Sequence, residues 1–429
     1  MLRRTIPFSY FLIAAFIILG LYVPAMNFVA LFTAMYMILV ASKNSLVCIT
    51  VFILPFATVF KLTIPGFSFF NIILICVLLR VIMLNYYKLS AKSWIVLLLF
   101  GCFTLLTSLK ADIIACVTVV CSFAFVVCLI DQNNDEIILE DIVFFASLGV
   151  IITSIVAKLN VDVFPRLRPL MEETATIRIE AGEYFSRFSG LMGNPNHYSF
   201  LVSVLLAVYC VIIIRNKANL LDLIIFITLS VFGFMSISLS FIFAYIFMIL
   251  LILCSTFKHD VKDFVKYFML FGFGLFLCLM FLSKDTFDVI KFRFARIFDE
   301  NIELSSATSG RSDLWLYYIK HLLTNIPTMI LGSGIGSGNL PIGASHNFYI
   351  DILYHLGIIG GIFFIACISV IFKPNPFANK KSKFFNYIPI LIFLFRAFSI
   401  NLIHAEQLPF CLLICALTIN WYDRGSIKE

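Results

Sequence analysis

Long apolar runs, repeated along the chain, limit what it can fold into more than any other feature. A helix that crosses a bilayer needs about 20 mostly apolar residues, and about fourteen runs of that order occur. Of the 429 residues, 62% are apolar and only 13% are charged, which is about half the charged share of a soluble domain. This composition excludes a soluble enzyme, a nucleic-acid-binding protein and a disordered chain. The sequence predicts an all-α polytopic membrane protein with helices near 7–25, 27–42, 44–61, 67–84, 93–109, 112–130, 139–158, 197–214, 220–236, 238–256, 265–283, 347–371, 385–401 and 407–421.

Two long polar segments separate the apolar runs into three groups. The basic residues concentrate in alternate short loops, which favours a cytoplasmic position for those loops. They also account for the net charge of +7, so this charge does not point to nucleic acid. The predicted parts are helices 1–7 in 1–158, a first outer loop at 159–196, helices 8–11 in 197–283, a second outer loop at 284–346 and helices 12–14 in 347–429.

The orientation follows from the start of the chain. With Arg3 and Arg4 in the cytoplasm, both chain ends are cytoplasmic and both long loops face outward. This prediction depends on two helices in 220–256, where 37 residues are too many for one helix and tight for two. The run 44–61 is a second weak assignment, because it contains Pro55.

The second outer loop predicts two short helices. Apolar residues spaced three and four apart, with basic residues between them, predict an amphipathic helix over 287–298 that lies on the membrane surface. A second helix is expected from Gly310 and Arg311 to Pro327. The twelve Cys of the chain all fall within apolar runs. They are therefore interpreted as small packing residues and not as a disulfide framework or a zinc site.

An arginine stands just before the eighth predicted helix. The segment from Arg187 to Asn196 ends in Asn194, Pro195 and Asn196, which suit the capped first turn of a helix. An ordinary capped helix start explains the Asn and Pro residues. It does not explain an arginine held at the membrane surface, so Arg187 is a candidate binding residue.

Two further arginines occupy unusual positions. Arg311 opens the second short helix, and contact with lipid headgroups explains it about as well as a site does. Arg396 lies inside the apolar run 385–401, where a cation is costly unless it is paired. Snorkelling towards the outer surface is the alternative for Arg396. Because guanidinium groups match phosphate oxygens in bidentate fashion, the three outward arginines are candidates for binding a diphosphate.

A histidine and an asparagine mark the start of the twelfth predicted helix. His346 can accept a proton near neutral pH, and Asn347 or Asp351 can set its tautomer. The alternative is an interfacial histidine without a partner. The Gly-rich approach at 332–338 fails the spacing of a phosphate-binding loop, and a flexible lid or hinge is expected there. No Asp-x-Asp pair or pair of histidines at ligand spacing appears, so no metal site is predicted.

Residues 185–200 and 309–360 resemble the O-antigen ligase and O-antigen polymerase superfamily of bacterial envelope proteins. Outside these residues the chain is similar to the family only in hydropathy and in its two large loops. The family pattern has His-Asn, nine residues, Gly, two residues and Gly, and it also has an Arg-led approach to Asn-Pro-Asn and a Gly-Arg pair before an aromatic helix. The matching residues are His346, Asn347, Gly357 and Gly360, then Arg187 to Asn196, and then Gly310, Arg311 and Trp315.

This resemblance implies a GT-C-like membrane glycosyltransferase that uses undecaprenyl-diphosphate-linked sugar donors without a metal or a cofactor. It implies His346 as the catalytic base, Arg187, Arg311 and Arg396 around the diphosphate, and Asn194, Asn196, Asn347 and Asp351 in support. It also implies the bacterial cytoplasmic (inner) membrane, with membrane lipids, a chain-length regulator and a flippase as partners. The stretches 54–61 and 187–196 are more similar to the polymerase branch, which joins repeat units of O-antigen or capsule-type polysaccharide.

Two alternatives remain open. A ligase of the same superfamily transfers a finished polysaccharide from undecaprenyl diphosphate to lipid A core. A transporter of lipid-linked oligosaccharide also has many helices and buried arginines, but paired halves and polar residues near the middle of the membrane are expected of it.

Overall fold

The computed structural model describes residues 7–63, 68–84, 89–109, 111–130, 137–159, 166–167, 176–178, 184–215, 217–257, 261–298, 310–372 and 384–421. Nearly all of these residues are helical, because a helix satisfies its own backbone N–H and C=O groups where water is absent. The first group comprises α1 (Phe8–Gly20), α2 (Ala25–Val40), α3 (Lys43–Ile53), η1 (Leu54–Phe56), α4 (Ala57–Phe60), α5 (Phe69–Met83), α6 (Ala91–Thr107), α7 (Ile113–Ile130) and α8 (Leu139–Leu159).

The rest of the chain contains two groups of apolar helices and the short helices of the second loop. The middle group is α10 (Pro195–Ile214), α11 (Leu220–Met235), α12 (Leu239–Phe257) and α13 (Val261–Phe281). The second loop holds α14 (Lys284–Phe298), α16 (Arg311–Thr324) and α17 (Ile326–Leu331). The last group is α18 (Phe348–Ile371), η4 (Phe384–Tyr387), α19 (Ile388–Ala397) and α20 (Leu408–Ile419).

The apolar helices coincide with the fourteen predicted runs, but fewer than fourteen have the length of a membrane span. Among the described residues, six segments have the length and hydropathy to cross a membrane, and eight further apolar helices have 10–17 residues. These lengths and compositions indicate a multi-pass helical membrane protein. The shorter helices arise because turns take residues from the ends of the apolar runs; α19, for example, ends at Ala397 and α20 begins only at Leu408.

The two weak assignments have clear structural outcomes. The 220–256 region forms two helices, because α11 ends at Met235 and α12 begins at Leu239 after a tight turn. In the 44–61 run, Pro55 replaces one turn of α-helix with the 3₁₀ turn η1 between α3 and α4. One feature departs from the all-α prediction: in the first loop, β1 (Thr176–Arg178) pairs antiparallel with β2 (Tyr184–Ser186).

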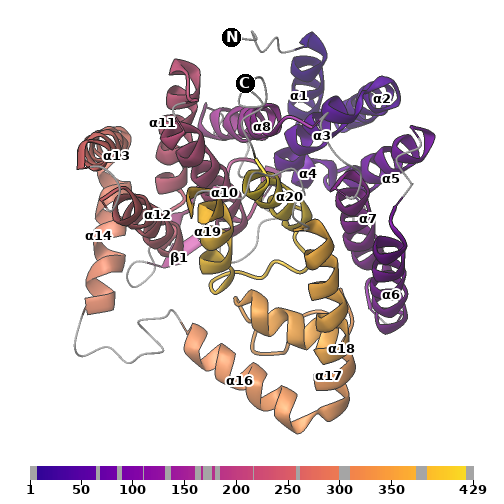
Figure 1. Cartoon of the computed structure of the whole chain (residues 1–429). Coiled ribbons are helices and arrows are strands. Elements are labelled where there is room, and N and C mark those ends of the chain that lie inside the picture. Colours follow the sequence, from indigo (N-terminus) through magenta and orange to yellow (C-terminus); the bar gives the residue numbers. More distant parts are fainter. Residues whose placement is uncertain are drawn as a thin grey trace.

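Helix α10 lies in the middle of the bundle, in contact with α8, α11, α12, α19 and α20 (Figure 1). Its 18-residue apolar window is 89% buried, whereas that of α7 is 44% buried. Short helices of the second loop, α16 and α17, lie at one edge of the molecule, and α17 packs on α18 (Figure 1). The start of α10 is therefore enclosed by protein on several sides, which makes it a protected position for polar groups.

Polar contacts divide the helix ends into two groups. At one end, Lys61 after α4 pairs with Glu406 before α20 at 3.2 Å, and Arg187 in the segment before α10 bonds to the α11–α12 turn. At the other, Asn44 in α3 bonds Asp141 in α8 at 3.0 Å. If successive helices run in opposite directions through the bundle, the same helix ends fall into the same two groups. We call the first group the site end and the second the opposite end.

Candidate functional site

Three arginine side chains converge on residues 236–240, which form the turn between α11 and the first residues of α12. They come from three separate parts of the chain: the segment before α10, the middle of α14 and the last turn of α19. The acceptors are the carbonyl oxygen of Ser236 for Arg187 Nε at 3.1 Å, the carbonyl oxygen of Ile237 for Arg293 Nη1 at 2.6 Å, and the hydroxyl groups of Ser238 and Ser240 for Arg396 Nη1.

The backbone of this turn is strained. Ile237 has a φ of 50°, in the left-handed region that β-branched residues rarely adopt. Such a conformation persists only where the surrounding structure enforces it, and it often occurs at functional sites. It leaves the carbonyl groups of Ser236 and Ile237 available to the arginines.

Asn196 links two of the arginines at the first turn of α10. Its side-chain oxygen accepts a hydrogen bond from Arg187 Nη2 at 3.0 Å, and its carbonyl oxygen accepts one from Arg396 Nη2 at 3.2 Å. Asn194 caps the helix, because its side chain accepts from the N–H groups of Asn196 and His197 at 2.9 and 3.2 Å. The sequence left open which asparagine caps α10; Asn194 does so, and Asn196 is free to hold the arginines.

Arg396 is the most deeply buried of these cations. Its side chain is 0% exposed, and its partners in the described part of the chain are neutral oxygens of Asn196, Ser199, Ser238 and Ser240. The Nε of Arg396 is buried without a hydrogen-bond acceptor among the described residues. The snorkelling alternative is therefore wrong in this structure. A cation this deeply buried with neutral partners is unfavourable on its own and favours a nearby anion.

Arg311 completes the positive region. It is the first residue of α16, and burial lowers the pKa of its guanidinium group. Burial also lowers the pKa of Arg187 well below its ordinary value, and the charges of Arg293, Arg311 and Arg396 lower it further. Arginines remain charged even so. The three predicted arginines thus share one positive field, which an anion would relieve.

Ser345, the residue before His346, is connected to the elements that carry Arg311 and Arg396 through two hydrogen bonds. Trp315 Nε1 donates to the carbonyl oxygen of Ser345 at 2.9 Å, and Trp315 lies about one helical turn from Arg311. The hydroxyl group of Ser345 donates to Asn401 Oδ1 at 3.1 Å, a few residues beyond Arg396. His346 itself has a φ of 49°, an unusual backbone for a residue other than glycine.

The predicted partners of His346 act elsewhere. Asn347 caps α18, since its side chain accepts from the N–H groups of Tyr349 and Ile350 at 3.0 and 3.3 Å. The carboxylate of Asp351 lies 3.3 Å from Nε2 of His355 and therefore orients His355 and not His346. This corrects the expectation that Asp351 sets the tautomer of His346, and its cause is helical geometry: residues four apart share one face of α18.

Gly357 of the His346 motif has a structural explanation. Gly357 has a φ of 64° and interrupts α18, so the carbonyl groups of Tyr354 and His355 accept instead from the N–H groups of Ser333 and Gly334 at 2.8 and 3.0 Å. A Cβ on Gly357 would lie 2.4 Å from the backbone nitrogen of Gly332. The first part of the 332–338 loop is thus packed against α18, and the flexible lid or hinge predicted from the sequence stays a prediction.

Two features of this site, Arg293 and the 236–240 turn, were not predicted from the sequence. Arg293 was counted among the basic residues of an amphipathic helix, and α14 is such a helix, but its contact with Ile237 depends on how α14 packs. The 236–240 turn carried a weak signal, since Ser236, Ser238 and Ser240 alternate within an otherwise apolar stretch. Nothing local indicated that Ile237 would adopt a left-handed backbone.

Comparisons with known proteins add no assignment. Within the part of the chain that the structure describes, no group of three or more His, Cys, Asp or Glu side chains is placed to hold a metal ion. No protein-family model matches the chain, and neither a curated protein nor a solved structure matches it.

Proposed function

We propose that this chain is a membrane glycosyltransferase that polymerises undecaprenyl-diphosphate-linked oligosaccharide repeat units on the outer face of the bacterial cytoplasmic membrane. The observation that carries the proposal is the convergence of Arg187, Arg293 and Arg396 on the 236–240 turn, within the field of Arg311. A diphosphate suits such guanidinium groups, because each of them can bind two of its oxygens.

In the proposed reaction, His346 removes the proton from a hydroxyl group of the acceptor sugar. The acceptor oxygen then forms a bond to the anomeric carbon of the donor, and the bond from that carbon to the diphosphate oxygen breaks. Undecaprenyl diphosphate leaves with the electron pair, and the arginines stabilise its charge, the role that a metal ion has in other transferases. The burial of Arg187 and Arg396 strengthens this stabilisation, because the protein around them has a lower dielectric constant than water.

The arrangement in the membrane belongs to the same proposal. All fourteen apolar helices cross or enter the membrane, the site end faces outward, and both chain ends are cytoplasmic. The donor and the acceptor are lipid-linked, a flippase delivers them, and a regulator sets chain length. With the site end outward, the arginines and His346 lie at the depth of lipid phosphates.

Reconstitution of the purified protein in vesicles with pre-flipped, lipid-diphosphate-linked repeat units tests the proposal. A ladder of longer lipid-linked glycans is expected. Transfer to lipid A core but not to a second repeat unit would favour the ligase alternative. If repeat units cross the bilayer and no glycosidic bond forms, the protein is a transporter and the proposed function is wrong.

A further inference from the structure

Helix α16 has more apolar surface than its packing against the protein uses. On its inner face, the side chains of Tyr318 and Leu322 are 1% and 6% exposed. On a second face, Leu316, Ile319 and Leu323 are 68%, 45% and 68% exposed. We call these three exposed residues the α16 stripe. A helix that only covers the rest of the protein needs the first face alone, so the stripe indicates a further binding partner.

The inner face holds α16 in a defined orientation. The hydroxyl group of Tyr318 donates to the carbonyl oxygen of Gly343 at 2.9 Å. The ring of Tyr318 also meets the ring of Tyr354 in α18 edge-on, with 5.1 Å between the ring centroids. Trp315 Nε1 donates to the carbonyl oxygen of Ser345 at 2.9 Å. Because these contacts prevent rotation of α16 about its axis, they also fix the direction in which the stripe points.

The exposed polar residues of α16 lie on a side of their own. With 3.6 residues per turn, the stripe spans about 60° around the helix axis. The exposed residues Asp313, Lys320 and Thr324 span about 40°, and they lie beyond the stripe as seen from the inner face. Exposed apolar and exposed polar side chains are therefore separated around the helix. A helix that lies along the boundary between lipid and water requires this separation.

The position of α16 in the molecule also favours lipid. Helices α16 and α17 lie at one edge of the molecule and contact α18 (Figure 1). The apolar helices indicate a multi-pass membrane protein, and lipid surrounds the sides of such a bundle. The inner face of α16 bonds to Gly343 and Ser345, just before α18 begins at Phe348. Helix α16 therefore lies near the level of a helix end, where the apolar part of a bilayer meets the headgroups.

Two neighbouring features match the chemistry of a lipid surface. Helix α17 also exposes apolar side chains, at Ile326, Ile330 and Leu331. Lys320 is exposed and directly follows Ile319 of the stripe. Its apolar stem can cover hydrocarbon while its ammonium group reaches a lipid phosphate. An apolar stripe bordered by a lysine is the arrangement of helices that bind at a membrane surface.

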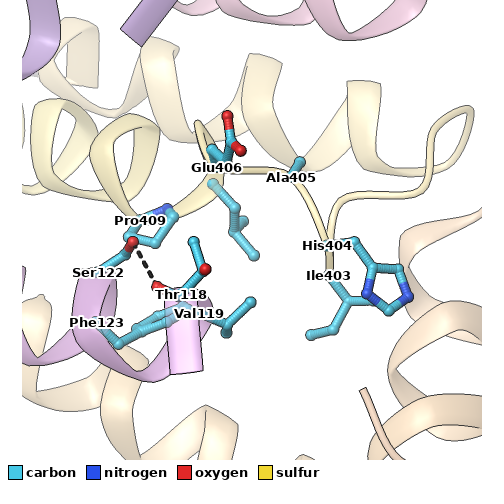
Figure 2. A pocket seen from close by; sticks show the side chains of 10 residues that line it. Thr118, Val119, Ser122, Phe123, Ile403, His404, Ala405, Glu406 and Pro409 are labelled. Atoms are coloured by element: carbon cyan, nitrogen blue, oxygen red, sulfur yellow. Dashed lines mark hydrogen bonds between the residues drawn. The ribbon is translucent and has the colours of Figure 1, made fainter. Parts of the chain in front are cut away.

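The stripe differs from the small hollow at the site end. That hollow lies between α7 and the 398–407 loop that joins α19 to α20, and Ser122, His404 and Glu406 are among the residues that line it (Figure 2). His404 also contacts His355 of α18, with 3.1 Å between the two Nε2 atoms. No residue of α16 lines this hollow. The hollow presents hydroxyl, imidazole and carboxylate groups, whereas the stripe is wholly apolar and suits hydrocarbon.

We propose that α16 lies flat on the bilayer leaflet at the site end, with the stripe among the lipid acyl chains and Lys320 at the lipid phosphates. Arg311 is the first residue of α16, so this contact with lipid also sets the depth of Arg311 in the membrane. The consequence for Arg311 rests on the proposed function. The contact between the stripe and lipid does not.

Site-specific photocrosslinking tests the contact without any assay of activity. The photoreactive residue p-benzoylphenylalanine replaces Leu316 or Leu323, and the purified full chain is irradiated in vesicles of phosphatidylethanolamine and phosphatidylglycerol. Mass spectrometry should detect phospholipid adducts at both positions. The same residue in place of Asp313 or Thr324 is the matched control and should give several-fold fewer lipid adducts. Equal lipid adducts on the two sides, or adducts to a second copy of the chain in place of lipid, overturn the proposal.

The consequence for Arg311 is tested by variants of two adjacent residues on different sides of α16. Leu323→Gln removes apolar surface from the stripe, and elongation in vesicles should fall by about tenfold or more, because a small misplacement of a binding group is costly. Thr324→Gln is the matched control and should keep the wild-type rate. Leu323→Met keeps the apolar surface and should restore the rate.

Hydrogen exchange separates this effect from a loss of fold. In Leu323→Gln, exchange of the α16 amides in vesicles should become faster, while exchange in α10 stays unchanged. Equal elongation rates for Leu323→Gln and Thr324→Gln contradict the role of the stripe in placing Arg311. If the wild type elongates no glycans, the proposed function fails, while the crosslinks still decide whether α16 contacts lipid.

Discussion

The two ends of the helix bundle hold their arginines in opposite ways. At the opposite end, Arg80 donates twice to the carbonyl oxygen of Ala41, at 3.3 and 3.1 Å. Arg215 donates to Asn386 at 2.8 Å and lies over the ring of Trp421. Each of these cations ties two neighbouring helix ends together. At the site end, by contrast, four arginines from distant segments share one region, where burial lowers the pKa of Arg187 and the charges of the other three lower it further.

We infer from this difference that the arginines at the two ends of the bundle have different roles. A single arginine that joins two helix ends stabilises the bundle. Several arginines gathered around one strained turn repel one another, which opposes folding. We infer that the opposite end contributes stability, whereas the site end contributes binding and chemistry at some cost in stability.

The largest effect is expected from His346→Gly. If His346 is the base, elongation should fall by about 10²–10⁴-fold. Glycine tolerates the positive φ of this position, so the melting temperature should stay equal or rise. Measured together, these quantities separate loss of chemistry from loss of fold. Elongation near the wild-type rate would remove His346 from its proposed role.

Arg396→Lys keeps the charge but loses the planar fork, and elongation should fall by about 10²-fold. Arg187→Lys is expected to behave in the same direction. Arg80→Lys at the opposite end is the matched control and should leave the rate unchanged, because within the described part of the chain its guanidinium bonds to the carbonyl oxygen of Ala41, far from the site end. Equal rates in the Arg396 and Arg80 variants would break the contrast between the two ends.

Gly357→Ala should lower the free energy of unfolding by about 1–3 kcal/mol, because alanine disfavours a φ of 64° and its Cβ meets the backbone of Gly332. Gly272→Ala in α13 is the control, since a Cβ there has open space around it. Thermal unfolding in detergent measures both variants. A smaller loss for Gly357→Ala than for Gly272→Ala would contradict the packed 332–338 loop.

The smallest effect is expected from Asn386→Ala. It removes one acceptor of Arg215 and should lower stability by about 1 kcal/mol with no change in the elongation rate. The same thermal and elongation assays apply. A loss of elongation as large as that of Arg396→Lys would show that the opposite end also serves the reaction.

Sequence interpretation located the arginines and His346 but not their local partners. Arg187, Arg311 and Arg396 stood out because charge is rare near apolar runs, and the structure places them in one positive region. The spacing of four residues is compatible with a contact between Asp351 and His355, but the sequence interpretation assigned Asp351 to His346 instead. His404 had no such signal, since it lies 49 residues from His355 along the chain.

The helical, membrane-type fold follows from the apolar runs alone, because a backbone without water must bond to itself and a helix does this within one segment. The run boundaries, the capped start of α10 and the break at Pro55 are equally local. Which arginines meet at the 236–240 turn, why Ile237 is strained and which groups contact His355 depend on contacts between residues up to 200 positions apart. Only the packing of the helices brings those residues together.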